Sequence, residues 1–418
     1  MAAAVVMTPP PSPPIHSLSN TTTNPHYHHL LTLITHCTAM PQLKQIHANA
    51  LRTLSPDHPS TLFLHSRLVH FSASTDLDYA SRLLHHIDNP NSFIWNTVIR
   101  AHAWNPHRKI EAFRLYRKML MDGRVKQDKH TFPLVLKALA YLSWLSEGMQ
   151  VHAHVVKLGY ASDVYINNSL VHFYVSCGRV YVGRKVFDEM PERSLVSWNV
   201  MIDGYVEVGE FETALWLFVE LQEKELFAPD GFTMQTVVCA CGGMSALSLG
   251  MWAHAYVLRK CVVGVVGDAL LKNSLLDMYC KCGSLEMACQ VFDSMQRRDV
   301  ATWNSMIMGF AMHGKVEKAL EAFETMREDE EIAPNSITFV SVLSACNHGG
   351  LVEEGRLYFD LMVSKYKIEP QLEHYGCMVD LLARAGLIDD ALNLVADMHV
   401  KPDVVIWRSL WMLVASKM

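Results

Sequence analysis

The chain repeats itself with a period of about 104 residues, and this periodicity constrains its fold more than any other feature. Similar phrases recur at intervals of 103, 105 and 104 residues around Trp95, Trp198, Trp303 and Trp407. VFDEM returns as VFDSM after 105 residues, and QIHANAL, QVHAHVV and WAHAYVL keep nearly the same spacing. Three phrases in one register indicate repeated units that stack along the chain and bury their apolar side chains against their neighbours.

Each period divides into three shorter segments with the pattern of a helical hairpin. Segments 269–299, 300–335 and 336–371 contain 31, 36 and 36 residues. Glycines near the segment centres predict a tight turn between two helices: Gly178, Gly209, Gly283, Gly314 and Gly386. An apolar stripe with helical spacing follows in one second half: Val316, Ala319, Leu320, Phe323 and Met326. The sequence therefore predicts an all-α protein, an α-solenoid of about ten to eleven helix-turn-helix hairpins.

The composition excludes two classes of protein. Half of the residues are hydrophobic and 19% are charged, which is too apolar for a disordered chain. No apolar run approaches the roughly 18 residues that span a bilayer. The formal net charge of −6, from 36 Lys+Arg and 42 Asp+Glu, gives no global argument for nucleic acid, so any such site would have to be local.

The N-terminus has the composition of a targeting segment. The first acidic residue is Asp57, and the opening residues are rich in Ser, Thr and Pro. We expect residues 1–25 to be an organelle transit peptide, with a disordered, untargeted N-terminus as the alternative. The absence of Arg from this segment favours the chloroplast, with the mitochondrion or both organelles as alternatives.

Several phrases resemble plant organellar pentatricopeptide repeat (PPR) proteins: WNVMIDGYVEVGEFETALWLFVEL, NSLLDMYCKCGSLEMACQVFDSM and ITFVSVLSACNHGGLVEEGRLYFDLM. The alternation of standard, long and short motifs resembles the PLS class of that family. DKHTFPLVLKALAYLSWLSEG and PERSLVSWNVMIDG further resemble a chlororespiratory-reduction type RNA editing factor. The resemblance implies a right-handed superhelix that binds single-stranded organellar RNA and selects cytidines for C-to-U editing.

In the family's register the repeat array occupies residues 26–403. The long motifs are 26–60, 129–163, 231–268 and 336–371; the short motifs are 61–91, 164–194, 269–299 and 372–403; the standard motifs are 92–128, 195–230 and 300–335. We place the extra residues of 92–128 and 231–268 in the turn between the helices or at the motif end. Residues 404–418 resemble the start of a truncated E-type extension.

The resemblance assigns base recognition to the fifth and last residues of standard and short motifs, one repeat for each base. The pairs that read U are Asn96 with Asp128, Asn199 with Asp230, and Asn273 with Asp299. Asn168 with Ser194 favours C, and Asn304 with Asn335 reads a pyrimidine. Second residues would stack on the bases: Phe93, Tyr165, Val196, Leu270 and Ala301. The predicted footprint, starting at motif 92–128, is 5′-U-N-Y-U-N-U-Y-N-N-3′.

Each of these residues has a purely structural alternative. Asn is a favoured helix N-cap, but its recurrence beside Trp, with Asp or Asn closing the motif, favours base recognition. We interpret the four Trp side chains of the repeated phrase as structural. No base is assigned to His65 with Asn91 or to Gly376 with Asp403. Nor do the long motifs receive one, with Pro133, Gln235 and Val340 at the fifth position.

The remaining patterns indicate packing and not chemistry. Cys239/Cys241 and Cys280/Cys282 are C-x-C pairs without the spacing of a zinc finger. We interpret the recurrent His47, His152 and His254 as buried structural residues. The H-x-E…P-C-x-x-C signature of zinc deaminases is absent from the sequence. We therefore expect no catalysis, metal or cofactor, and either a cytidine deaminase domain protein acting in trans or a truncated gene model.

The sequence thus predicts a site-recognition factor for organellar RNA editing, with single-stranded RNA as its partner and neither membrane nor DNA. One alternative is the same binder acting in RNA stability, splicing or translation. Another is a tetratricopeptide-like protein scaffold. The acidic net charge mildly favours that scaffold, because phosphate neutralisation supplies much of RNA affinity.

Overall fold

The computed structural model describes residues 25–54, 59–224, 227–260, 268–329, 331–404 and 406–410. These residues form 22 α-helices and no strand, which confirms the predicted α-solenoid. Ten pairs of successive helices pack as hairpins, four within the first of two compact units and six within the second. Most of the predicted transit peptide lies outside the described residues. So do residues 261–267 of long motif 231–268 and residues 411–418 of the predicted extension.

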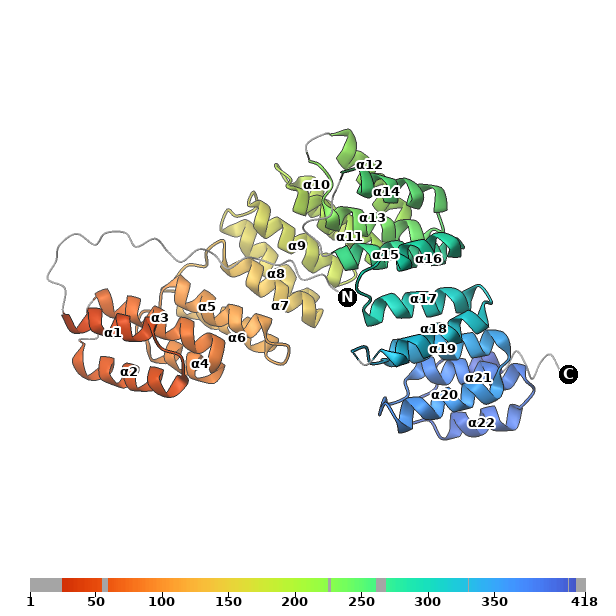
Figure 1. The fold of residues 1–418 in the computed structure, drawn as a ribbon. Coiled ribbons are helices and arrows are strands. Elements are labelled where there is room, and N and C mark those ends of the chain that lie inside the picture. Colours follow the sequence, from red (N-terminus) through yellow and green to blue (C-terminus); the bar gives the residue numbers. More distant parts are fainter. Residues whose placement is uncertain are drawn as a thin grey trace. The chain divides into compact units, whose positions relative to one another are not determined.

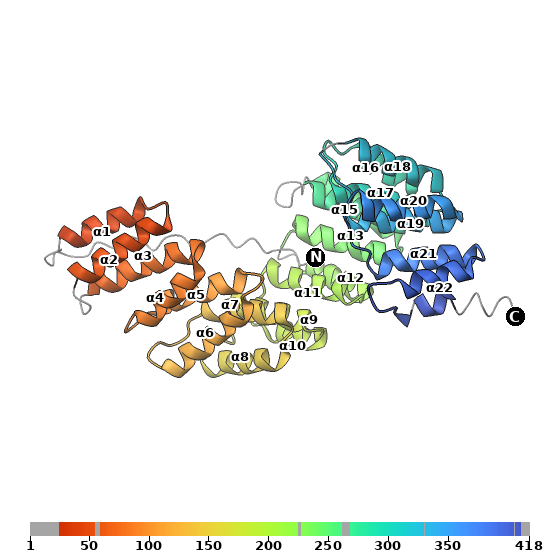
Figure 2. The ribbon, with the colours of Figure 1, turned by 90° about the horizontal axis from the view of Figure 1, so that it is seen from below.

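The first compact unit extends to Cys177. Its helices are α1 (Pro25–Thr35), α2 (Met40–Thr53), α3 (Pro59–Thr75), α4 (Leu77–His86), α5 (Ser92–Trp104), α6 (Lys109–Asp122), α7 (Thr131–Leu142), α8 (Leu145–Lys157) and α9 (Val164–Ser176). Figure 1 and Figure 2 show the hairpins stacked in sequence order. Helices α1, α3, α5, α7 and α9 pack on one another in turn, and each intervening helix packs on the odd-numbered helix that follows it.

The second unit begins at Gly178 and repeats this arrangement. Its helices are α10 (Val180–Glu189), α11 (Leu195–Glu207), α12 (Phe211–Glu223), α13 (Gly231–Gly243), α14 (Leu247–Lys260), α15 (Asp268–Lys281), α16 (Leu285–Asp293), α17 (Val300–Met312), α18 (Val316–Glu328), α19 (Ser336–Gly349), α20 (Val352–Ser364), α21 (Leu372–Arg384) and α22 (Ile388–Ala396). Consecutive odd-numbered helices from α11 to α21 are again in contact.

The predicted turn glycines lie between the helices of the hairpins in the left-handed region, with φ between 67° and 82°. At Gly314 the N–H donates to Ala311 O, and the next N–H donates to Phe310 O. These are the two hydrogen bonds of a Schellman motif, which requires a positive φ that glycine adopts without steric cost. The same pair of bonds follows α11, α15 and α21.

The recurrent Trp side chains hold the first helices against the preceding hairpin. Trp95, Trp198 and Trp303 are 3%, 1% and 7% exposed. Trp198 packs edge-on against Phe187 of α10 at 5.0 Å between ring centroids, and Trp303 makes the same contact with a Phe of α16. Their predicted structural role is confirmed.

Trp407 departs from this pattern, because its side chain is 52% exposed. Ile406, which directly precedes Trp407, and Leu410, three residues after it, are buried instead in the apolar cluster around Tyr375 and Val379. The interpretation of Trp407 as a structural residue like the other three Trp residues is therefore wrong. Adjacent residues of a helix point in different directions, so the burial of Ile406 turns Trp407 away from the cluster.

The described residues contain no helix long and apolar enough to cross a bilayer.

Candidate nucleic-acid interface

The last residue of a motif begins the first helix of the next one. Asp230, Asp299 and Asn335 have extended backbones, and their side chains accept the N–H three residues later at the start of α13, α17 and α19. Asp128 lies three residues before the first residue of α7, and its side chain accepts the N–H groups of His130 at 2.9 Å and Thr131 at 3.1 Å in the turn that leads into this helix. The closing residues of these motifs are thus helix-capping residues, which satisfy an N–H group that the helix itself leaves unpaired.

Four of the predicted Asn residues bind the capping residue across the motif boundary. Asn96, Asn199 and Asn304 are buried, and Asn273 is half-buried. The Nδ2 to carboxylate or amide oxygen distances are 2.9 Å for Asn96–Asp128, 3.2 Å for Asn199–Asp230, 3.1 Å for Asn273–Asp299 and 3.2 Å for Asn304–Asn335. Each predicted pair is therefore a contact in the fold. The alternative that these four Asn residues are themselves helix caps is wrong, because each lies on the fifth residue of its motif, inside the helix.

The two residues of the fifth predicted pair belong to different units. Asn168 lies on α9 of the first unit, and its buried Oδ1 has no hydrogen-bond partner among the described residues. Ser194 belongs to the second unit, where it caps α11 and exchanges hydrogen bonds with Ser197.

Hydrogen bonds favour the ionised form of two capping carboxylates, Asp128 and Asp299. Burial alone would raise the pKa of Asp128, but hydrogen bonds from Ser92, Asn96, the His130 N–H and Thr131 bring that pKa below its usual value. Burial opposes ionisation of Asp299 too, and bonds from Thr302, Asn273 and the Ala301 N–H lower its pKa. An ionised carboxylate only accepts hydrogen bonds, so the nitrogen end of the Asn amide must face it.

A third residue at each of these four junctions was missed by the sequence analysis. The Thr three residues after the capping residue donates to the Asn amide oxygen. The Oγ1 to Oδ1 distances are 2.8 Å for Thr131–Asn96 and 2.7 Å for Thr233–Asn199, Thr302–Asn273 and Thr338–Asn304. A usable signal existed, since Asp or Asn followed three residues later by Thr is a capping pattern, and it recurs at four motif boundaries.

The predicted stacking residues lie one helical turn before the Asn residues and face solvent. Phe93, Tyr165, Val196 and Leu270 are between 41% and 53% exposed, and Ala301 is exposed as well. Positions three residues apart share one face of a helix. Exposed apolar side chains therefore lie next to the hydrogen-bonded pairs, which is an arrangement suited to a flat ring with a polar edge.

Comparison with known proteins decides the family. Residues 298–348 match the PPR repeat family, and residues 168–195, 196–226, 272–300, 337–366 and 373–401 match the PPR repeat. An Arabidopsis thaliana pentatricopeptide repeat-containing protein named as mitochondrial is 37% identical over 385 residues, covering 91% of this chain and 74% of that protein. The chain belongs to the pentatricopeptide repeat family.

Two further Arabidopsis thaliana relatives are longer than this PPR chain. One, named as chloroplastic/mitochondrial, is 57% identical over 387 residues, which cover 92% of this chain and 60% of the relative. The other, CRR2, named as chloroplastic, is 37% identical over 390 residues, which cover 92% of this chain and 58% of the relative. The chain thus spans about three fifths of the length of these relatives.

Solved PPR structures share the fold of this chain. Maize PPR10 superimposes with a TM-score of 0.55 at 18% identity, covering 94% of this chain and 66% of PPR10. PPR10 in complex with an 18-nucleotide psaJ RNA element gives a TM-score of 0.67 at 17% identity, covering 94% of this chain and 56% of PPR10. At this level of identity the likeness establishes the solenoid fold alone.

The recurrent His residues of the PPR chain tie adjacent hairpins together. They lie half-buried on α2, α8 and α14, and their Nδ1 atoms are 2.8 to 2.9 Å from the hydroxyls of Tyr79, Tyr174 and Tyr279. Burial is the main cause that lowers the pKa of His254, so its neutral form is favoured. These contacts support the predicted structural role, although the rings are less buried than expected.

The cysteines of the PPR chain are packing residues where the structure describes them. Cys241 and Cys280 are buried, and burial raises the pKa of each thiol to about 12. No group of three or more metal-ligating side chains occurs within the described ranges. Thiols with such high pKa values are poor nucleophiles and poor metal ligands.

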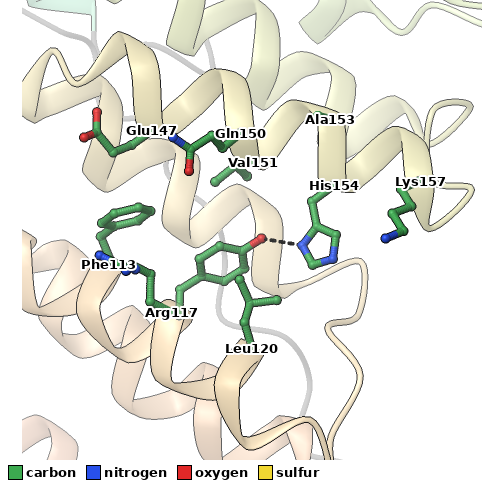
Figure 3. Close-up of a pocket in the computed structure, with 10 residues that line it drawn as sticks. Phe113, Arg117, Leu120, Glu147, Gln150, Val151, Ala153, His154 and Lys157 are labelled. Carbon is green, nitrogen blue, oxygen red and sulfur yellow. Dashed lines mark hydrogen bonds between the residues drawn. The ribbon is translucent and has the colours of Figure 1, made fainter.

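One cleft in the first unit of the PPR chain has no residue of an Asn pair in its lining. It has a volume of about 310 Å³ between α6 and α8, and its lining residues include Phe113, Tyr116, Arg117, Gln150 and Lys157. Figure 3 shows Arg117 and Glu147 at one end and Lys157 at the other. Tyr116 and His154 bridge its floor through a 2.9 Å contact between the hydroxyl and Nδ1. The candidate interface consists of separate small sites on the first helices, one in the first unit and three in the second.

Proposed function

We propose that this PPR chain is a sequence-specific single-stranded RNA-binding protein that recognises sites for organellar C-to-U RNA editing. The observation that carries the proposal is the recurrent pairing of a fifth-position Asn with the capping residue of the next helix, beside an exposed second-position side chain. The PPR10 structure with its psaJ RNA element shows that this fold is compatible with an RNA ligand in another member of the family.

The hydrogen-bond groups left at each pair match a pyrimidine edge. Asn199 donates one Nδ2 hydrogen to Asp230 and accepts from Thr233, which leaves a second Nδ2 hydrogen for a base. The Asp230 carboxylate adds an acceptor. Uracil presents an N3–H donor next to carbonyl acceptors, so it complements both groups, whereas the lone pair on N3 of cytosine would face a carboxylate.

The pair Asn304–Asn335 leaves a different group. The amide oxygen of Asn335 accepts from Asn304 and from the Thr338 N–H, so its amide nitrogen remains as a donor. A donor suits N3 of cytosine as well as a carbonyl oxygen of uracil. This difference supports a pyrimidine at this motif and U at the three motifs closed by Asp, as in the footprint 5′-U-N-Y-U-N-U-Y-N-N-3′.

Editing itself requires a partner in this proposal. The chain would hold the transcript so that a cytidine a few nucleotides 3′ of the footprint reaches a deaminase domain supplied in trans. The names of the relatives place them in the chloroplast, the mitochondrion or both. We propose the chloroplast as the site of action, with the mitochondrion as the alternative.

Affinity measurements with designed RNAs test the proposal. We expect the purified full chain to bind an unstructured RNA carrying the footprint at least about tenfold more tightly than an RNA with purines at the assigned positions, because several hydrogen bonds are lost together. Asn199→Ala should abolish the preference for U at its own position. Asn393→Ala, at an exposed Asn on the second helix α22, is the matched control and should change nothing.

A second arm separates the roles that a sequence-specific binder could have. Loss of the protein in the plant should abolish C-to-U conversion at cytidines that follow a footprint match, as read by sequencing organellar transcripts. Unchanged editing with altered transcript abundance or splicing would indicate the alternative RNA roles. Absence of RNA binding by the folded chain would contradict the proposal and favour a protein scaffold.

A further inference from the structure

We propose that base selection by a motif depends on a positioning residue in the motif that follows, namely the hydroxyl at its third position. The inference rests on the proposed RNA-binding function. The residues concerned are Thr131, Thr233, Thr302 and Thr338, which act on Asn96, Asn199, Asn273 and Asn304 respectively.

Each Thr hydroxyl is fully engaged by the reading pair. At the junction of Asp299, the Asp299 N–H donates to Oγ1 of Thr302 at 3.2 Å. The single hydroxyl proton lies between two acceptors, Oδ1 of Asn273 at 2.7 Å and Oδ1 of Asp299 at 2.8 Å. The junction of Asp230 has the same contacts, at 3.2 Å, 2.7 Å and 2.8 Å.

The two ends of the Asn amide are therefore held by different motifs. The capping residue takes one hydrogen of the nitrogen, and the Thr hydroxyl donates to the oxygen. Together they fix the amide plane and leave one N–H in a defined direction. With the Thr hydroxyl removed, the amide oxygen would lose its only contact in the triad, and the amide would be free to rotate about its χ2 torsion, which is intrinsically soft.

Helix capping alone does not explain the hydroxyl. Asn91 caps α5 through the Ile94 N–H at 3.0 Å, and Asp163 caps α9 through the Ile166 N–H at 3.0 Å. Asp403 accepts the Ile406 N–H at 3.0 Å. An apolar third residue thus supports the side-chain half of the cap. At the Thr junctions the hydroxyl oxygen adds the other half of a capping box, because it accepts the N–H of the capping residue. That role uses only the oxygen, so the hydroxyl proton stays available for the Asn amide oxygen, to which it is donated.

In the sequence the hydroxyl accompanies the Asn and not the cap. All five motifs with a fifth-position Asn are followed by a motif whose third residue is Thr or Ser: Thr131, Ser197, Thr233, Thr302 and Thr338. All six other motifs, including the short motifs with His65 and Gly376, are followed by a third residue without a hydroxyl: Phe63, Ile94, Ile166, Leu271, His374 and Ile406. Motif class does not separate the two groups, because short motifs occur in both.

The long motifs thereby contribute to the recognition of bases by the standard motifs. Three of the four Thr residues, Thr131, Thr233 and Thr338, belong to long motifs, whose own fifth residues carry no assigned base. Each such motif would complete the reading site of the standard motif before it. The reading unit is then a pair of adjacent motifs joined through one hydroxyl.

The test removes the hydroxyl and keeps the shape of the side chain. Thr233→Val and Thr233→Ser are made in the full chain, and affinities are measured for four RNAs that differ only at the base assigned to Asn199. We expect Thr233→Val to reduce the preference for U about fivefold, the usual worth of one net hydrogen bond, and Thr233→Ser to retain it. The preference at the base assigned to Asn304 is the internal control and should not change.

A double-mutant cycle separates positioning from stability. If Thr233 acts through Asn199, Thr233→Val has no further effect on base preference in the Asn199→Ala background. The inference is overturned if Thr233→Val lowers the unfolding midpoint while the base ratios stay those of the wild type and Asn199→Ala changes them. If Asn199→Ala also leaves the ratios unchanged, the proposed function fails instead.

Discussion

At each pair of an Asn with its capping residue, one atom type in the capping residue decides which hydrogen-bond group remains for the proposed contact with a base. Asp230 offers a second carboxylate oxygen, whereas Asn335 offers an amide nitrogen in the equivalent place. The two pairs are otherwise alike. Each has an Asn at the fifth position of its motif, a Thr hydroxyl that donates to the amide oxygen of that Asn, and a capping residue at the start of the next helix. The chain thus offers a direct comparison between a pair closed by Asp and a pair closed by Asn.

Reciprocal substitutions exploit this comparison. We expect Asp230→Asn to admit C at the position assigned to Asn199, and Asn335→Asp to exclude C at the position assigned to Asn304. Each change replaces an acceptor by a donor or the reverse, with almost no change in shape. Competition binding with RNAs that differ by one U-to-C exchange measures both effects. Unaltered U-to-C ratios in both variants would show that the capping residues do not contact the bases.

The sequence was informative about these residues to different degrees. The Asn and capping residues could be predicted because they recur in register along the chain, as at Asn199 and Asp230. Thr233 could not be assigned to the site in the same way. Its bond to Asn199 joins residues 34 positions apart, and only the packing of α13 on α11 brings them together.

At the scale of the helix, α11 carries a carboxyl group that the fold destabilises. Asp203 lies one turn after Asn199, and burial, followed by the nearby Glu207, raises its pKa to about 6. A raised carboxyl pKa means that ionisation of this group costs more free energy in the folded state than in the unfolded state. The resulting loss of stability is absent at a pH below the unfolded value, grows as the pH rises towards the folded pKa, and is constant above it.

Replacing this carboxylate should therefore stabilise the protein in a pH-dependent manner. We expect Asp203→Asn to raise the free energy of unfolding by about 3 kcal/mol at about pH 7.5, and by about 1 kcal/mol at about pH 4.5. Urea unfolding at the two pH values measures the difference. An equal effect at both would mean that Asp203 has an ordinary pKa in the folded protein.

We expect substitution by Ala to have opposite effects on stability at two helical glycines, because the space around them differs. A Cβ at Gly148 of α8 would lie 1.9 Å from the ring of Phe173 on α9, whereas a Cβ at Gly376 of α21 would meet nothing within 4 Å. We expect Gly148→Ala to destabilise the protein by about 1 to 3 kcal/mol through overpacking. Gly376→Ala should stabilise it by about 0.5 to 1 kcal/mol, because Ala loses less backbone entropy in a helix.

Thermal unfolding of the two variants is the measurement for this pair. Equal effects of the two substitutions would show that α8 does not approach α9 as closely as the structure describes.

The hairpins were the most predictable part of the fold. Period, central glycine and apolar stripe each follow from one local requirement, and four of the five stripe residues of α18 are buried: Val316, Ala319, Phe323 and Met326. Trp407 was less predictable, since its phrase matches Trp303 while its surroundings differ. A repeated sequence phrase shows where a motif begins, but the burial of a side chain in it depends on which residues pack against that side chain.

At the scale of the whole chain, charge is distributed unevenly between the two units. Residues up to 177 contain 15 Lys+Arg and 9 Asp+Glu, whereas residues from 178 contain 21 and 33. Arg100 lies one turn after Asn96 in the first unit, and Lys137 lies 5.1 Å from the ring of Trp104. Asp203 takes the place of Arg100 in the second unit. The overall acidity therefore belongs to the second unit, whereas the first unit carries an excess of basic residues, which would favour a polyanionic ligand.

We propose that the Asn pairs read pyrimidines in single-stranded RNA. To test this, the purified full chain is used to select RNAs from a randomised single-stranded pool, and the bound fraction is sequenced. We expect enrichment of U-N-Y-U-N-U-Y, with the first U opposite Asn96. In Asn199→Ala the enrichment of U should be lost at the position assigned to Asn199 alone. If the folded, helical chain enriches no pattern, or a pattern unrelated to the spacing of the Asn pairs, these pairs do not read RNA bases.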